Sequence, residues 1–189
     1  MKKTTGILIA LSLLVLAGCG AATGKAETNE KPAAADKPET AAEAVLAGIE
    51  TKDIYGEDYK LSLPSEDYDL IMINIWGTYC GPCRVEMPEL AKLTAQLPER
   101  VLQLGLCIDG TIQADAAKQI VESAGGTYDN LLPSESFEEL LGKVAYIPTT
   151  VFLSSKGELV GEMEVGVPQG DVVEGYLNMI NSRLEQLEK

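Results

Sequence analysis

Apolar residues follow two patterns along this chain, and their order predicts alternating strands and helices. Residues 70–76 and 101–108 are nearly continuous apolar runs, which are typical of strands buried on both faces of a sheet. Between and after these runs, apolar residues recur at helical spacing over 82–97 and 114–124. The pattern therefore predicts two buried strands, each followed by a helix.

Two hairpins, a short strand over 127–131, a helix over 136–141 and a C-terminal helix complete the predicted fold. Runs at 49–55 and 59–63 flank a Gly-Glu-Asp turn, and runs at 149–153 and 159–165 flank a Ser-Lys-Gly turn. A final amphipathic helix is expected over 169–187. We therefore expect an α/β fold with a mixed β-sheet flanked by helices and an N-terminal β-hairpin.

The first residues have the pattern of an export signal. Lys2 and Lys3 precede an apolar run over 6–17, which is too short for a transmembrane span. The stretch Leu16-Ala17-Gly18-Cys19 resembles the lipobox of bacterial lipoproteins, in which the signal is cleaved before the cysteine and that cysteine is acylated. An ordinary cleaved signal with an incidental cysteine is the alternative.

Composition then separates a tether from a folded domain. Residues 20–44 are rich in Ala, Glu, Lys, Thr and Pro and contain almost no large apolar side chain, which favours a disordered tether over a helical spacer. The predicted organisation is a lipoprotein signal peptide over 1–18, a lipidated Cys19 with its tether over 19–44, and one domain over 45–189.

Charge and composition exclude several classes of function. The 189-residue chain has a formal net charge of −14, which does not suit a nucleic-acid surface. It contains no histidine, which removes histidine metal sites, Cys-His proteases and Ser-His-Asp hydrolases. Strong chemistry must therefore come from cysteine, carboxylate or amine groups.

The cysteines point to that chemistry. With Cys19 assigned to lipid, Cys80 and Cys83 form a close pair and Cys107 is left alone. The pair follows a predicted strand and begins a predicted helix, where the helix dipole stabilises a thiolate. Cys80 is placed to attack a disulfide and Cys83 to resolve the mixed disulfide, so no cofactor is needed. A zinc site would need two further ligands.

Residues 45–189 resemble the thioredoxin-fold, membrane-tethered thiol-disulfide oxidoreductases of the TlpA/ResA type. Three motifs carry the resemblance, at 74–83, 86–90 and 147–150. It implies a cis Ile147–Pro148 bond beside the cysteines and a backbone at Ile147 that hydrogen-bonds to the substrate chain. The substrate-binding residues that it implies are Trp76, Tyr79, Gly81, Pro82, Ile147, Pro148 and Thr149.

Four side chains have more than one interpretation. Glu86 matches the family acid that tunes the thiols, and we expect it to transfer protons or set their pKa values, although a solvated helix carboxylate is the alternative. Thioredoxin has a buried acid at the position of Asn74. Cys107 is expected to be an inert core thiol, with a third redox cysteine as the alternative. The aromatic pair Trp76 and Tyr79 would form a platform at the disulfide or belong to the core.

The resulting expectation is an extracytoplasmic protein, lipid-anchored to the outer face of the bacterial cytoplasmic membrane, that reduces disulfides in client proteins. Its electrons would come from a membrane thiol transporter of the CcdA/DsbD type. A thiol peroxidase is one alternative, but peroxiredoxins have Thr-x-x-Cys where Gly77 precedes Cys80 here. A surface binding module with a structural disulfide is another. The client could be apocytochrome c, a methionine sulfoxide reductase or another envelope protein.

Overall fold

A computed structural model describes residues 44–188. Five strands form a mixed sheet in the order β5-β4-β3-β6-β7, with β3, β4 and β5 parallel and with β6 and β7 antiparallel to their neighbours. Their bounds are β3 Leu70–Trp76, β4 Val101–Cys107, β5 Asn130–Leu131, β6 Thr149–Ser154 and β7 Glu164–Val165. The expected mixed sheet is therefore confirmed.

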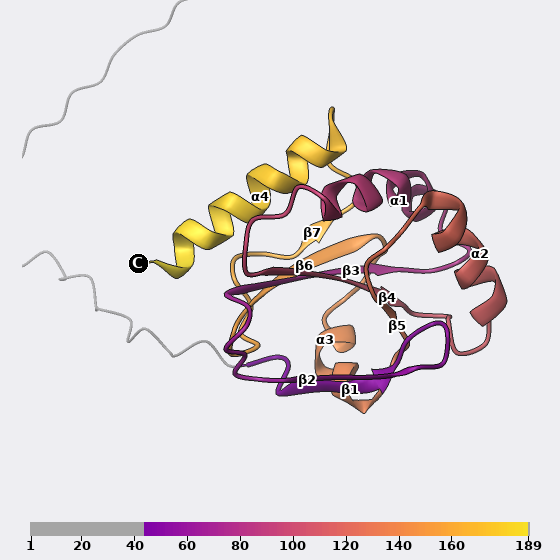
Figure 1. Cartoon of the computed structure of the whole chain (residues 1–189), viewed down its shortest axis with the longest axis horizontal. Coiled ribbons are helices and arrows are strands. Elements are labelled where there is room, and N and C mark those ends of the chain that lie inside the picture. The colour runs from indigo at the N-terminus through magenta and orange to yellow at the C-terminus, as the bar shows by residue number, and fades with distance from the viewer. Residues whose placement is uncertain (1–43, 189) are drawn as a thin grey trace, which may run out of the picture. The chain divides into compact units, whose positions relative to one another are not determined.

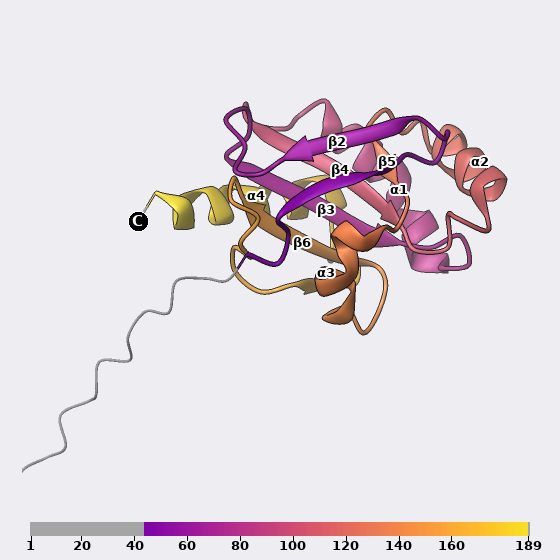
Figure 2. The same ribbon diagram turned by 90° about the horizontal axis from the view of Figure 1, so that it is seen from below.

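Helices cover this sheet on both faces. Figure 1 shows α1, α2 and α4 on one face, and α3 with the β1–β2 hairpin on the other. The bounds of these elements are β1 Gly48–Lys52, β2 Asp58–Ser62, α1 Gly81–Thr94, α2 Ala114–Ala124, the 3₁₀ turn η1 Glu135–Phe137, α3 Glu138–Gly142 and α4 Val172–Leu187. Figure 2 shows the hairpin running along the sheet. The N-terminal hairpin and the flanking helices are both as expected.

Each face of the sheet buries its own set of side chains. Successive residues of a strand point to opposite faces, so a strand covered on both faces is apolar at nearly every position. In β3, Ile71 and Ile73 pack toward the hairpin and α3, whereas Leu70 and Met72 pack toward α1 and α4. All seven residues of β3 are buried. The continuous run at 70–76 is thereby explained.

The second predicted hairpin is shorter than its sequence pattern indicated. Its first strand is β6, but the second is reduced to the two residues of β7 and one isolated bridge between Leu153 and Leu159. Gly161 interrupts the run with a φ of 75°, in the left-handed region that a strand does not use. The prediction of a continuous strand over 159–165 is therefore wrong.

The arrangement brings three strand ends to one edge of the sheet. β3 and β4 are parallel and end at Trp76 and Cys107, and antiparallel β6 begins beside them at Thr149. Residues that follow β3 and β4, and residues that precede β6, must therefore lie together. None of the helices within residues 44–188 is long and apolar enough to cross a membrane. The predicted signal peptide, Cys19 and tether lie outside the described residues, apart from Ala44.

Candidate active site

The Cys80–Cys83 pair lies at the first turn of α1, directly after β3. Cys80 is the N-cap residue, and its sulfur accepts a hydrogen bond from the backbone N–H of Cys83 at 3.2 Å. Pro82 occupies the first turn, where its missing N–H costs no helical hydrogen bond. The two cysteines form a disulfide, with their Cα atoms 5.3 Å apart. Unpaired N–H groups at this helix start favour negative charge on a sulfur.

The two sulfur-bearing residues differ in their access to solvent. Cys80 is 7% exposed, whereas Cys83 is completely buried beneath the first turn of α1. Gly81 and Pro82 between them are exposed. A disulfide on another protein can therefore reach Cys80 first. This order agrees with the predicted roles of Cys80 as nucleophile and Cys83 as resolving cysteine.

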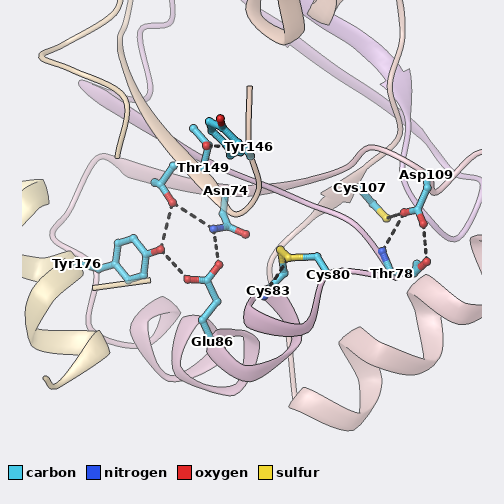
Figure 3. Close-up of a disulfide and its surroundings, with 11 residues drawn as sticks. Asn74, Thr78, Cys80, Cys83, Glu86, Cys107, Asp109, Tyr146, Thr149 and Tyr176 are labelled. Atoms are coloured by element: carbon cyan, nitrogen blue, oxygen red, sulfur yellow. Dashed lines mark hydrogen bonds between the residues drawn. A yellow bond between two sulfur atoms is a disulfide. The ribbon is translucent and has the colours of Figure 1, made fainter. Parts of the chain in front are cut away.

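Glu86 lies one turn further along α1 and is completely buried. Asn74 Nδ2 donates to its Oε1 at 3.0 Å, and the Tyr176 hydroxyl donates to its Oε2 at 2.9 Å (Figure 3). Burial raises the pKa of Glu86 to about 7, against the opposing effect of these two hydrogen bonds. The alternative of a solvated surface carboxylate is wrong. The group can gain or lose a proton near neutral pH.

The segment before β6 reaches the turn that precedes Cys80. The Ile147–Pro148 peptide bond is cis. Ile147 packs against the cluster that contains both cysteines, and its Cδ1 would lie 3.2 Å from a side chain at Gly77. Within residues 44–188, neither the N–H nor the C=O of Ile147 forms a backbone hydrogen bond. The backbone of this half-buried residue therefore lies beside the disulfide without a backbone partner among the described residues.

The two aromatic residues before Cys80 occupy different environments. Trp76 is completely buried against the cysteines, and its Nε1 donates to Asn130 Oδ1 at 3.0 Å. Tyr79 is 71% exposed. The predicted aromatic platform is therefore limited to Tyr79, because Trp76 offers no surface to a client.

A surface pocket lies beside Ile147. It encloses about 550 Å³ and is lined by Tyr79, Ile108, Leu141, Val144, Ala145, Tyr146 and Ile147. Thr149, another predicted substrate contact, is buried instead, and its hydroxyl donates to the backbone oxygen of Tyr146 at 2.8 Å. That bond fixes the segment that forms one wall of the pocket.

Cys107 ends β4 on the other side of the disulfide. It is a free, completely buried thiol whose Sγ donates to Asp109 Oδ1 at 3.3 Å. Burial raises the pKa of this thiol far above its ordinary value, with the neighbouring Asp109 adding to the effect. A thiol held protonated in this way is a poor nucleophile. The environment agrees with the prediction of an inert core thiol.

Asp109 also holds the turn that leads into Cys80. Its Oδ1 accepts the backbone N–H of Thr78 at 3.0 Å, and its Oδ2 accepts the Thr78 hydroxyl (Figure 3). Burial alone would raise the pKa of Asp109, but the hydrogen bonds from Thr78 and Cys107 outweigh it and lower the pKa below its usual value. A carboxylate that is charged at neutral pH therefore anchors Thr78, two positions before Cys80.

Sequence reasoning missed several residues that complete the site. Asp109 carried a visible signal, because it directly follows the strand predicted over 101–108, which contains Cys107. Thr150 and Tyr176 gave none, since they lie 76 and 90 positions from the residues that they contact. Asn130, which accepts the hydrogen bond of the Trp76 indole, begins the short strand β5 and gave no signal either.

A disulfide at the start of the helix that follows the central strand of such a sheet is typical of thioredoxin-like thiol-disulfide oxidoreductases. Comparisons with known proteins lead to the same class. No protein-family model matches the chain. It is 33% identical over 115 residues to the thiol-disulfide oxidoreductase ResA of Oceanobacillus iheyensis, a match that covers 58% of this chain and 56% of that protein. The chain thus matches little more than half of that relative's length.

Two further comparisons cover more of the chain. It is 25% identical over 184 residues to the thiol-disulfide oxidoreductase ResA of Bacillus cereus, which covers 95% of this chain and 99% of that protein. The crystal structure of StoA from Bacillus subtilis superposes with a TM-score of 0.57 at 23% identity, over 74% of this chain and 99% of StoA. The predicted thioredoxin-like fold is confirmed, and the chain is a homologue of proteins named thiol-disulfide oxidoreductase ResA.

Proposed function

We propose that the chain reduces disulfide bonds in client proteins outside the cytoplasm through a Cys80/Cys83 dithiol–disulfide cycle. The observation that carries the proposal is the contrast between an accessible Cys80 at a helix start and a buried Cys83 behind it. A helix N-terminus stabilises the thiolate that must attack. Glu86, which titrates near neutral pH, is the acid–base group of this site.

The cycle balances in two exchange steps. The Cys80 thiolate attacks one sulfur of the client disulfide, which breaks that bond and releases a client thiolate that takes up a proton. Cys83 then loses its proton and attacks Cys80 Sγ, so that the second client sulfur leaves as a thiol and the Cys80–Cys83 disulfide forms. Two electrons and two protons pass to the client. Glu86 takes up and returns the proton that a cysteine loses.

The client chain would lie along the face that carries Tyr79 and Ile147. The free backbone N–H and C=O of Ile147 can pair with an extended client segment. The neighbouring pocket offers an apolar surface to the residues around the client cysteine. This arrangement would recognise the backbone of the client rather than one particular client side chain.

The direction of the reaction is part of the proposal. Gly81 and Pro82 between the cysteines resemble the pair in reducing thioredoxins, whose potential is about −270 mV. A membrane thiol transporter of the CcdA/DsbD type would return two electrons to the Cys80–Cys83 disulfide after each turnover. Lipid on Cys19 would hold the domain at the outer face of the bacterial cytoplasmic membrane, close to such a donor.

A trapping experiment tests the proposal. With Cys83→Ser, Cys80 can attack a disulfide but cannot be released from it, so we expect a covalent adduct between Cys80 and a reducible substrate such as insulin. Cys80→Ser is the matched control and should form none. An adduct on the control, or none on Cys83→Ser, would contradict the proposed roles.

Measuring the reduction potential separates working chemistry from a structural bond. A reducing oxidoreductase should have a Cys80–Cys83 potential near that of thioredoxin, about −270 mV. A value well below about −300 mV would instead favour a structural disulfide. Clients captured from the cell envelope by Cys83→Ser would then identify the substrate.

A further inference from the structure

Tyr176 on α4 reaches the buried carboxylate of Glu86 on α1. Its side chain is only 1% exposed and packs among apolar residues such as Leu90 and Ile180. The hydroxyl is the one polar group of that side chain, and it donates to Glu86 Oε2 at 2.9 Å. A buried hydroxyl needs a hydrogen-bond partner, and here the partner is the proposed acid–base group.

Tyr176 is also part of a closed ring of hydrogen bonds. Its hydroxyl lies 3.2 Å from Thr150 Oγ1 on β6. Asn74 Nδ2 donates both to Thr150 Oγ1 at 3.1 Å and to Glu86 Oε1 at 3.0 Å. Figure 3 shows Glu86 between Asn74 and Tyr176, on one side of the disulfide. Four side chains from α1, β3, β6 and α4 thus hold one another in place.

The protons available in this ring show which form of Glu86 it fits. The Asn74 amide supplies two protons, and the Thr150 and Tyr176 hydroxyls supply one each. The four hydrogen bonds use all four if Asn74 donates twice, Thr150 donates to Tyr176, and Tyr176 donates to Glu86. A protonated Glu86 would bring a fifth proton to these four contacts, so one proton would have no partner among them. The number of protons therefore matches the number of contacts when Glu86 is ionised.

We propose that Tyr176 is the positioning residue that holds buried Glu86 in its ionised, proton-accepting form. This inference rests on the proposed function, in which a cysteine S–H bond breaks and a Glu86 O–H bond forms as the thiolate is generated. Tyr176 contacts neither sulfur and acts through the carboxylate. Its helix, α4, thereby contributes to the chemistry at the start of α1.

The groups that face Glu86 support this assignment. Burial raises the pKa of the carboxyl to about 7, while the hydrogen bonds from Asn74 and Tyr176 lower it. The other titratable groups that face it are Tyr128, from the segment before β5, and the cysteine pair on its own helix. Within residues 44–188, no charged side chain of any neighbouring element forms an ion pair with Glu86. The hydroxyl of Tyr176 is therefore one of two groups that oppose the effect of burial.

Tyr128 provides a matched control for Tyr176. Its hydroxyl is also buried, and the charge of Glu86 contributes to raising its pKa. Among the described residues, however, this hydroxyl has no hydrogen-bond partner. Removing it takes one oxygen from the same buried region without removing a hydrogen bond to Glu86.

The test is a titration of Glu86 in the oxidised full chain, followed by NMR of ¹³C-labelled glutamate carboxyl groups. Tyr176→Phe should raise the Glu86 midpoint by about one pH unit, because a hydrogen bond to the charged form is lost. Tyr128→Phe should leave the midpoint at its wild-type value. Equal midpoints for the two variants would overturn the proposal.

A second variant keeps the test decisive if Tyr176→Phe does not fold. Thr150→Val leaves Tyr176 in place but removes the hydroxyl that is hydrogen-bonded to it, so the Glu86 midpoint should rise by a smaller amount. An unchanged Glu86 midpoint in Thr150→Val would contradict a role of the hydrogen-bonded ring. The titration uses the oxidised chain without a client, so it can succeed even if the wild-type chain reduces no disulfide. That result would overturn the proposed function alone.

Discussion

Glu86 and Asp109 lie on opposite sides of the Cys80–Cys83 disulfide, and each carboxylate accepts hydrogen bonds on both of its oxygens (Figure 3). Their protonation behaviour is nevertheless opposite. The pKa of Glu86 is raised to about 7, whereas the pKa of Asp109 is lowered. Glu86 is completely buried on α1, and Asp109 is half-buried in the turn after β4.

At Glu86 the effect of burial on the pKa is larger than the opposing effect of the hydrogen bonds. At Asp109 the hydrogen bonds have the larger effect. Removing a charged carboxylate fully from water costs more free energy than two hydrogen bonds contribute, so the neutral form is favoured and the pKa rises. Partial exposure leaves the Asp109 charge solvated, and its hydrogen bonds then decide the direction. One carboxylate can exchange protons near neutral pH, and the other stays charged and fixes the turn at Thr78.

The largest expected effect concerns Glu86→Gln and the pH dependence of stability. Because the folded pKa of Glu86 lies above its unfolded value of 4.5, the native state binds more protons between these values. The free energy of unfolding should therefore fall by up to about 3 kcal/mol as pH rises from about 4.5 to 7. Glu86→Gln should remove this fall. Urea denaturation of the oxidised protein at several pH values in this range measures the effect. If the free energy of unfolding of the variant fell with pH as steeply as that of wild type, Glu86 would not be the buried carboxyl that titrates.

A smaller effect of opposite sign is expected for Asp109→Asn. At pH 7 the variant should lose about 2 kcal/mol of stability, because one charge-assisted hydrogen bond to Thr78 is lost. A carboxyl with a lowered pKa contributes stability that is present above its unfolded pKa and is lost as pH falls through its folded pKa. The difference from wild type should therefore shrink below about pH 4.

A matched control isolates the contribution of Asp109. The Asp115 side chain is fully exposed and makes only a long contact with Lys118 at 3.9 Å. Asp115→Asn should change the free energy of unfolding by no more than about 0.5 kcal/mol. If both asparagine variants lost the same stability, the Thr78 turn would not depend on Asp109.

The smallest expected effect concerns the thiol next to Asp109. Cys107→Ala removes a buried sulfur that packs in the core, and it should lower the free energy of unfolding by about 1 kcal/mol. The rate of disulfide reduction should stay within about twofold of wild type, because a thiol with a strongly raised pKa supplies little thiolate. Loss of reduction in this variant would instead identify Cys107 as a third redox cysteine.

Several elements around the cysteines were predictable from the sequence because they obey local rules. The bounds predicted for β3 and α2 match the structure, since a continuous apolar run marks a strand buried on both faces and a glycine can end a helix. Gly125 has a φ of 72°, as such a helix end requires. The cysteine pair itself lies where strand and helix patterns meet.

The surroundings of Glu86 were not predictable in the same way. Its burial depends on α4, which packs against α1 although the two helices are far apart in the sequence. Tyr176 and Thr150 carry no local pattern that indicates a contact with Glu86 or Asn74. The one signal was Asn74, a polar residue inside a continuous apolar run, which must find buried partners.

Reduction of insulin by the pre-reduced protein tests the role of Cys80 most directly, when wild type, Cys80→Ser and Cys107→Ser are assayed side by side. The position of Cys80 at the helix start, with a small accessible area, and the complete burial of Cys107 predict that Cys80→Ser abolishes reduction and that Cys107→Ser retains it. Retained reduction by Cys80→Ser would contradict the assignment of the nucleophile and, with it, the proposed function.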